Sequence, residues 1–257
     1  PRLLPLEKKS TRFVFIEDVI AENVHLLTPE AKSKTCHVFR ITRDADIAVR
    51  EEEAADLLLS MEENLKQRRF GNVVRLEVSK SMPRQMVEYL TESLEISDED
   101  VYTVNGLLNT PDLMALYKLD RPELKYKPLH IHRPAELDGE ESYFDLIREK
   151  DILLHHPYMP YGIVTDFLRE AVNDPDVLAI KMCLYRTGAN SPIPPLLIEA
   201  SERGKQVTVL IELKARFDEE NNIEWARHLE SEGVHVVYGI RGIKTHSKVA
   251  LVVRREG

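Results

Sequence analysis

Strands and helices alternate at short, regular intervals in the second half of the chain, and this alternation restricts the fold more than any other sequence feature. Apolar runs typical of buried strands are followed by stretches with the spacing of amphipathic helices. The expected order is strand 151–155, helix 161–173, strand 177–185, helix 193–203, strand 206–213, helix 219–232, strand 234–238 and strand 248–253. Gly204 and Gly233 stand where two of these helices should end. Repeated strand–helix–strand units predict an α/β domain with a mainly parallel sheet covered by helices.

The first part of the chain, to about residue 132, has the pattern of a mixed α+β region. The predicted elements are strand 13–16, a short helix near His25, paired strands 36–41 and 46–49 with a turn at 42–44, helix 52–68, strand 73–78, helix 83–93, turns at 98–101 and 104–106, and helix 110–117. Residues 121–139 are rich in proline and polar side chains and show no period. We therefore predict an α+β domain over residues 1–132 and an α/β domain over residues 133–257.

Composition excludes several classes of protein. The 257 residues are 43% hydrophobic and 31% charged, which is typical of a globular protein with a core and not of a disordered chain. The net charge of −9 argues against general affinity for DNA or anionic membranes. No apolar run has the length of a transmembrane helix, and we expect no signal peptide. Cys36 and Cys183 lack metal-type spacing, so we expect reduced, buried thiols of a cytosolic protein, with a disulfide or a catalytic thiol as the alternative. From the ends at Pro1 and Gly257 we expect a piece of a longer chain.

Basic side chains lie at the predicted strand ends of the second domain. They are Arg186, Lys214, Arg216, His246 and Lys248, with Arg241 and Lys244 just before His246. A single arginine at a strand end usually forms a surface salt bridge, so none of these residues is informative alone. The carboxyl ends of parallel strands meet at one edge of a sheet, so we expect the five side chains to converge. Such a cluster favours a polyanion, because arginine forks match phosphate oxygens.

His246 is the candidate nucleophile within this cluster. We expect Lys244 and Lys248 to disfavour a proton on its ring by like-charge repulsion, which would leave the nucleophilic form of the imidazole. Such an imidazole among cations suits attack on a phosphoryl group. His228 and His235, by contrast, have the pattern of structural or solvated residues.

Two acidic or histidine-rich runs could bind metal but have simpler explanations. Asp218 to Glu220 could hold a metal or pair with Arg216; Asp218 also fits the N-cap of the following helix, with acidic residues in its first turn, and this interpretation is favoured. His155 and His156 lack a third ligand at recognisable spacing, which disfavours a metal site there.

Several motifs, in this order, resemble bacterial polyphosphate kinase of the phosphohistidine type. They are Phe39–Arg43, Asp100–Tyr102 through Asp112–Ala115, Asp151–Tyr158, Asp176–Lys181 running into Leu184–Thr187, Glu212–Glu220, Gly233–Tyr238 and Lys244–Lys248. The resemblance covers essentially the whole chain. It implies a four-domain enzyme, of which this chain holds most of the head domain and the larger part of the first phospholipase-D-like domain, truncated at its C-terminus.

The resemblance also implies roles for individual residues. His246 would accept the γ-phosphate of ATP, and Arg186 and Arg216 would hold phosphates of the magnesium-bound nucleotide or of polyphosphate. Lys214 and Lys248 would act as supporting cations. A guanidinium offers no lone pair to a metal, so we expect Mg²⁺ to be associated with the two arginines through phosphates, with no direct protein ligand.

The implied activity is that of an ATP:polyphosphate phosphotransferase whose partners are ATP, ADP and inorganic polyphosphate, with no nucleic acid. We expect a homo-oligomeric full-length protein in the bacterial cytoplasm, with peripheral membrane association left open, and no activity from residues 1–257 alone. Two alternatives stay open: a phospholipase-D-like phosphodiesterase or nuclease, and a non-catalytic polyanion-binding or oligomerisation module. Val249–Val253 contains no aspartate, which disfavours the phosphodiesterase.

Overall fold

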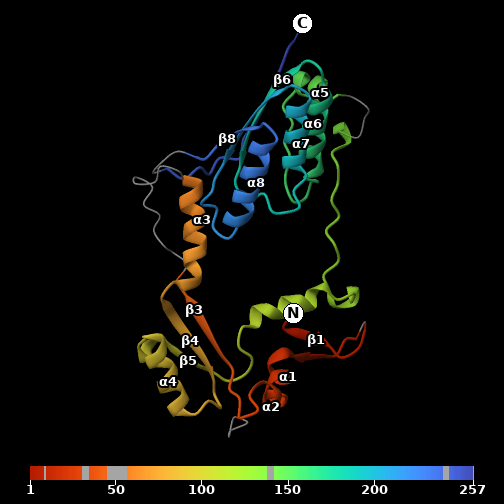
Figure 1. The fold of residues 1–257 in the computed structure, drawn as a ribbon. Helices are drawn as coiled ribbons and strands as arrows, with labels where there is room; N and C mark the ends of the chain where they lie inside the picture. The colour runs from red at the N-terminus through yellow and green to blue at the C-terminus, as the bar shows by residue number, and fades with distance from the viewer. Residues whose placement is uncertain (9, 31–34, 45–56, 138–141, 240–242, 257) are drawn as a thin grey trace. The chain divides into compact units, whose positions relative to one another are not determined.

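The computed structural model describes residues 1–257 except 9, 31–34, 45–56, 138–141, 240–242 and 257. The chain divides into two compact units (Figure 1). The first unit contains residues 1–47 and 67–127, and the second contains residues 48–66 and 128–257. The domain limits of 1–132 and 133–257 stay a prediction.

The first unit is built on two small sheets. Its elements are β1 (Leu3–Pro5), β2 (Phe13–Phe15), α1 (Ile16–Glu22), α2 (Val24–Leu27), β3 (Phe39–Arg43), the 3-10 helix η1 (Arg68–Phe70), β4 (Val73–Ser79), α4 (Arg84–Leu94), η2 (Asp98–Asp100), β5 (Val101–Val104), η3 (Thr110–Lys118) and η4 (Pro122–Leu124). β1 and β2 pair antiparallel. In the other sheet, β4 lies between an antiparallel β3 and a parallel β5. Leu76 and Val78 of β4 are buried against apolar residues of α4, and these side chains together form the core beside this sheet.

The sequence predicted the longer elements of the first unit and misassigned several shorter ones. The helix predicted over 110–117 is the 3-10 helix η3, and Val104, predicted in a turn, ends β5. Cys36, expected to be buried, is exposed. Strand 73–78 and helix 83–93 are confirmed as β4 and α4. The predicted turn at 42–44 is wrong for Thr42 and Arg43, because both continue β3 and pair with β4. The predicted turn at 98–101 includes the first residue of β5, a short strand held in place by its pairing with β4. The predicted strand 46–49 and the start of helix 52–68 lie outside the described residues.

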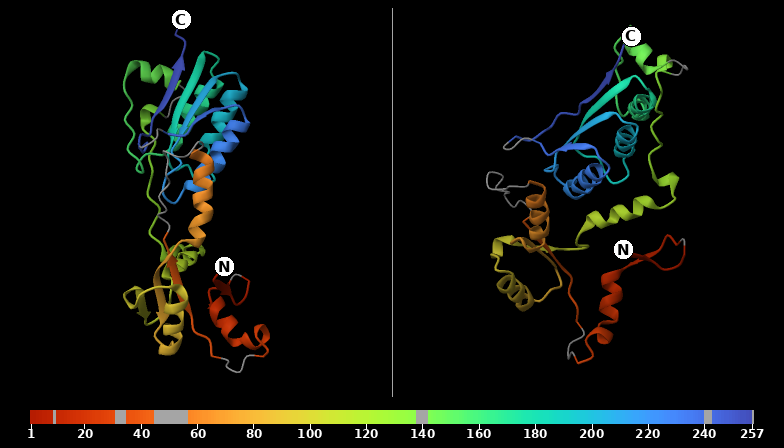
Figure 2. Two further views of the ribbon diagram at one scale, coloured as in Figure 1. Left: turned by 60° about the vertical axis from the view of Figure 1, so that its left-hand side comes forward. Right: turned by 45° about the horizontal axis from the view of Figure 1, so that its top comes forward.

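The second unit is a helix-covered sheet. Its elements are most of α3 (Leu57–Gln67), then η5 (Ala135–Leu137), α5 (Tyr143–Glu149), α6 (Gly162–Asn173), β6 (Val177–Leu184), α7 (Ile193–Glu202), β7 (Gln206–Ile211), α8 (Glu219–Ser231), β8 (His235–Val237) and β9 (Ala250–Arg254). The strand order is β8-β7-β6-β9, with β6, β7 and β8 parallel and β9 antiparallel to β6. Helices α6, α7 and α8 lie side by side on one face of the sheet (Figure 2). The predicted mainly parallel α/β sheet is confirmed.

Apolar burial between the helices and the sheet fixes this arrangement. Ile180 and Val209 of the central strands are fully buried against Leu168, Leu197 and Leu229 of the three helices. Burial of an aliphatic side chain contributes about 1.5–3 kcal/mol, so this layer is the main source of stability in the second unit. Gly204 and Gly233, expected at helix ends, have φ of 82° and 80°, a left-handed conformation that glycine adopts without strain.

Two strand predictions in the second unit need correction. Residues 151–155 form no strand; Ile152 and Leu154 instead pack against the cluster of Leu137, Leu146 and Ile163. The strand predicted over 248–253 begins at Ala250 and runs antiparallel to β6. Its start therefore lies beside the carboxyl end of β6. Helix α5 was not predicted.

Candidate active site

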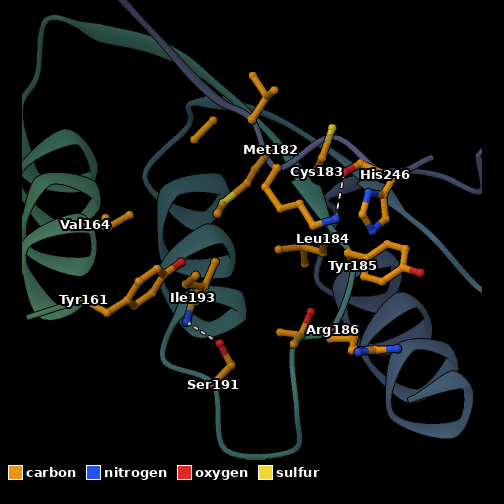
Figure 3. A pocket seen from close by; sticks show the side chains of 14 residues that line it. Tyr161, Val164, Met182, Cys183, Leu184, Tyr185, Arg186, Ser191, Ile193 and His246 are labelled. Carbon is orange, nitrogen blue, oxygen red and sulfur yellow. Dashed lines mark hydrogen bonds between the residues drawn. The ribbon is translucent and has the colours of Figure 1, made fainter. Parts of the chain in front are cut away.

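A pocket of about 670 Å³ lies at the carboxyl end of β6, where the segment leading into β9 runs alongside it (Figure 3). The Cys183 amide donates to the carbonyl of Val249 at 2.9 Å, which fixes the two segments against each other. The polar residues at one side of the pocket include Arg186, His246 and Lys248. The apolar residues that line it are Val164, Met182, Leu184, Ile193, Val249 and Ala250.

Tyr185 lies at the centre of the polar side. The centroid of its ring is 4.9 Å from that of His246, and the two rings are nearly perpendicular at 87°. Lys248 Nζ lies 4.1 Å from the same ring centroid. The guanidinium carbon of Arg186 lies 5.7 Å from it and Lys244 Nζ 5.9 Å. One aromatic side chain therefore lies within cation–π range of three cations and packs against the candidate nucleophile.

The backbone near His246 is tied to one of these cations. Lys248 Nζ donates a hydrogen bond of 2.7 Å to the His246 carbonyl (Figure 3). His246 itself is exposed, so a ligand in the pocket can reach its ring.

A buried carboxylate links the segment before β9 to the end of β7. Glu212 is 3% exposed, although it lies in a strand-end run that is otherwise apolar. One carboxylate oxygen accepts from the Lys214 amide at 2.9 Å, and the other accepts from the Thr245 amide at 2.6 Å. Hydrogen bonds to an ionised acceptor are roughly twice as strong as neutral ones, so Glu212 anchors the residue that precedes His246.

Helix α8 holds the ends of β6 and β7 together. The Asn222 side-chain amide donates to the carbonyls of Tyr185 at 2.6 Å and of Glu212 at 3.0 Å. On the same helix, Trp225 Nε1 donates to the carbonyl of Gly188 at 3.0 Å. Neither Asn222 nor Glu212 was assigned a role from the sequence; a polar residue within an apolar stripe was the available signal.

Asp218 occupies the N-cap position of α8, and Glu219 and Glu220 lie in its first turn, as expected. Its side chain, however, does not cap the helix. One carboxylate oxygen accepts from the Gly188 amide at 3.2 Å and the other from Asn221 Nδ2 at 2.7 Å. Asp218 therefore joins the loops after β6 and β7 instead of satisfying a helix amide.

The structure places the five predicted site residues in two groups. Arg186, His246 and Lys248 line the pocket. Lys214 and Arg216 lie on the loop after β7 and are not among the lining residues; Lys214 is half-buried and Arg216 is exposed. Arg241 lies outside the described residues.

The donors at the pocket suit an anion. Its charged side chains are cations, whereas the oxygens of Glu212 and Asp218 already accept hydrogen bonds. Within the described ranges, no three or more His, Cys, Asp or Glu side chains are grouped to hold a metal ion. In the same part of the chain, no helix has both the length and the apolar character needed to cross a bilayer.

Known proteins match this chain along most of its length. Residues 1–116 match the family described as polyphosphate kinase middle domain, and residues 142–257 match polyphosphate kinase C-terminal domain 1. Polyphosphate kinase 1 of Chlorobaculum tepidum is 48% identical over all of this chain and 38% of its own length. The polyphosphate kinase of Bacillus anthracis is 49% identical over 98% of this chain and 37% of its own length.

A solved structure supports the same assignment. The polyphosphate kinase of Porphyromonas gingivalis aligns with all of this chain and with 36% of its own, with a TM-score of 0.76 and 28% sequence identity. The chain thus spans well under half the length of the relatives that it matches. Both family matches and these relatives agree, so the chain belongs to the polyphosphate kinase family.

Proposed function

We propose that this chain is part of a polyphosphate kinase that reversibly transfers the γ-phosphate of ATP to polyphosphate through a phosphohistidine at His246. The observation that carries the proposal is the convergence of His246, Arg186 and Lys248 on one pocket of a chain from this family. An exposed imidazole beside two cations has the access and the electrostatic surroundings that phosphoryl transfer requires.

In the first half-reaction, a nitrogen of the neutral His246 ring attacks the γ-phosphorus of ATP. The new P–N bond forms as the bond to the β–γ bridging oxygen breaks, and ADP leaves with that electron pair. The other ring nitrogen keeps its proton. In the second half-reaction, a terminal oxygen of polyphosphate attacks the phosphorus, the P–N bond breaks and the imidazole is restored. Each step runs in both directions, since donor and acceptor are both phosphoanhydrides.

The cations of the pocket stabilise the charge on the transferred group. Arg186 can bind two phosphate oxygens with its planar fork, and Lys248 adds a point charge beside His246. Arg216 and Lys214, on the loop after β7, would contact more distant phosphates of ATP or polyphosphate. Mg²⁺ would enter with the nucleotide, bound by its phosphates, and neutralise part of their charge. Homo-oligomerisation and a cytoplasmic location are proposed from the family resemblance alone.

The test is phosphoenzyme formation by the full-length protein with ATP labelled in its γ-phosphate. We expect acid-labile label on the wild type and none on His246→Ala. His235→Ala removes an exposed histidine of β8 and is the matched control, which should label normally. Acid-labile label that persists in His246→Ala would refute the assignment.

The wild type and His246→Ala also distinguish the proposed kinase from the two alternative functions. Hydrolysis of a phosphodiester without ATP would favour a phospholipase-D-like enzyme. Polyphosphate binding that survives His246→Ala, with no ATP turnover by the wild type, would favour a non-catalytic polyanion-binding module.

A further inference from the structure

The proposed mechanism leaves unexplained how an exposed imidazole is held in one orientation. Among the residues that the structure describes, none forms a hydrogen bond with a ring nitrogen of His246. A nucleophilic histidine normally needs such an orienting group, because a freely rotating ring spends little time aligned with the phosphorus. The contact that restricts the His246 ring in this structure is the perpendicular ring of Tyr185 (Figure 3).

Tyr185 is itself firmly placed. It follows directly on β6, its carbonyl accepts from the buried Asn222, and its ring is half-buried. Edge-to-face packing at 4.9 Å and 87° is a favoured geometry for two aromatic rings. The contact therefore restricts the plane of the imidazole.

The same ring also attracts the cations. Lys248 Nζ, at 4.1 Å from the ring centroid, is well within the range of a cation–π interaction, and Arg186 lies near its limit at 5.7 Å. These cations repel each other when no phosphate is bound. The negative face of an aromatic ring offsets that repulsion, so the cations stay beside His246 before the substrate arrives.

We propose that Tyr185 is a positioning residue for phosphoryl transfer: its ring orients the imidazole of His246 and holds Lys248 and Arg186 where the oxygens of the transferred group will lie. This inference rests on the proposed function. The phenolic hydroxyl has no part in it, since it forms no hydrogen bond with any described residue. Removal of the ring should therefore matter, and removal of the hydroxyl should not.

The experiment measures a single turnover of labelled ATP on the full-length protein and records both the rate constant and the final amplitude of labelling. Tyr185→Leu should lower the rate constant about 10-fold or more at full amplitude, and Tyr185→Phe should stay within about 3-fold of the wild type. A tenfold loss corresponds to about 1.4 kcal/mol of transition-state stabilisation. A purely structural role would lower the amplitude, because fewer molecules would fold, and would leave the rate constant of the remainder unchanged.

Tyr102→Leu is the matched control. Tyr102 is a half-exposed tyrosine of the first unit that also carries a cation over its ring, Arg75 at 3.8 Å, and it is not a lining residue of the pocket. Its loss should leave the rate constant of labelling unchanged. If Tyr185→Leu does not fold, trifluorophenylalanine at position 185 keeps the ring size but withdraws negative charge from its face, and should also slow labelling.

Three results decide the matter. A slow Tyr185→Leu rescued by Tyr185→Phe supports the proposal. Wild-type rate constants in Tyr185→Leu, or in the fluorinated variant where Leu does not fold, overturn it and leave the phosphohistidine mechanism standing. Absence of label on the wild type, or label that persists in His246→Ala, refutes the proposed function and the role of Tyr185 with it.

Discussion

Glu212→Gln tests whether a buried carboxylate holds the segment that carries His246. The two oxygens of Glu212 accept from the amides of Lys214 and Thr245, and the side chain is 3% exposed. A glutamine has one acceptor oxygen and one NH₂ group in the same place. One backbone N–H would therefore face a donor in a buried site, and the negative charge that strengthens both bonds would be lost.

The expected cost follows from these two contacts. A buried donor left without a partner costs about 1–3 kcal/mol. If this cost falls on local opening of the segment, the Thr245 amide should open roughly 5- to 150-fold more often, at 1.36 kcal/mol per factor of ten. Because the segment includes His246, phosphoenzyme formation should slow as well.

The assay is hydrogen exchange of the full-length protein, read by mass spectrometry in a peptide that covers Thr245. Glu230→Gln is the matched control: Glu230 is an exposed residue of α8, and the same change there should leave exchange unaltered. Unchanged exchange at Thr245 together with an unchanged labelling rate in Glu212→Gln would refute the reasoning.

Two further predictions concern stability of the full-length protein. Met61→Ala should lower the free energy of unfolding of the second unit by about 2–5 kcal/mol in urea denaturation, because Met61 of α3 is 1% exposed within its core. Leu59→Ala on the same helix is the control and should cost far less, since Leu59 is 52% exposed. Equal losses in the two variants would show that α3 does not pack there. The Arg254 guanidinium lies 2.8 Å from the Asp174 carboxylate and lowers the pKa of that carboxyl by hydrogen bonding to it. The pair therefore stabilises the fold fully at any pH above the unfolded pKa of about 3.9. This stabilisation is lost as the pH falls through the lowered pKa of the folded state. The difference in melting temperature between wild type and Asp174→Asn should thus be full at neutral pH and shrink below about pH 4; a difference independent of pH would contradict it.

The periodic spacing of apolar residues was sufficient to predict an element where that element is long and buries one regular face. Helices α6, α7 and α8 and strands β6 and β7 have such patterns, and their predicted limits agree with the structure to within two residues. The pattern failed at residues 151–155, because alternating Ile152 and Leu154 can face a helix as well as a sheet. The antiparallel direction of β9 could have been inferred from the sequence. No helix was predicted between β8 and β9, and a parallel strand needs a long crossover connection.

The candidate site was partly accessible to the same reasoning. Arg186, His246 and Lys248 could be selected because each was predicted at a strand end. The expected reason holds for Arg186, which follows β6. His246 and Lys248 instead precede β9, and its antiparallel direction brings them to the carboxyl end of β6. The roles of Tyr185 and Glu212 could not be predicted, because they depend on contacts with a segment some 30 to 60 residues away. The local sequence shows that such a side chain is present, but it does not show which distant residues that side chain contacts.

The most direct test of the phosphohistidine mechanism is to locate the phosphoryl group in the wild-type protein after a short reaction with ATP. Fragmentation of the peptide that contains residues 244–248, under conditions that preserve P–N bonds, should place the phosphate on His246. The group should disappear when polyphosphate is added as acceptor. A phosphate on any other residue, or a phosphate on His246 that polyphosphate does not remove, would contradict the account.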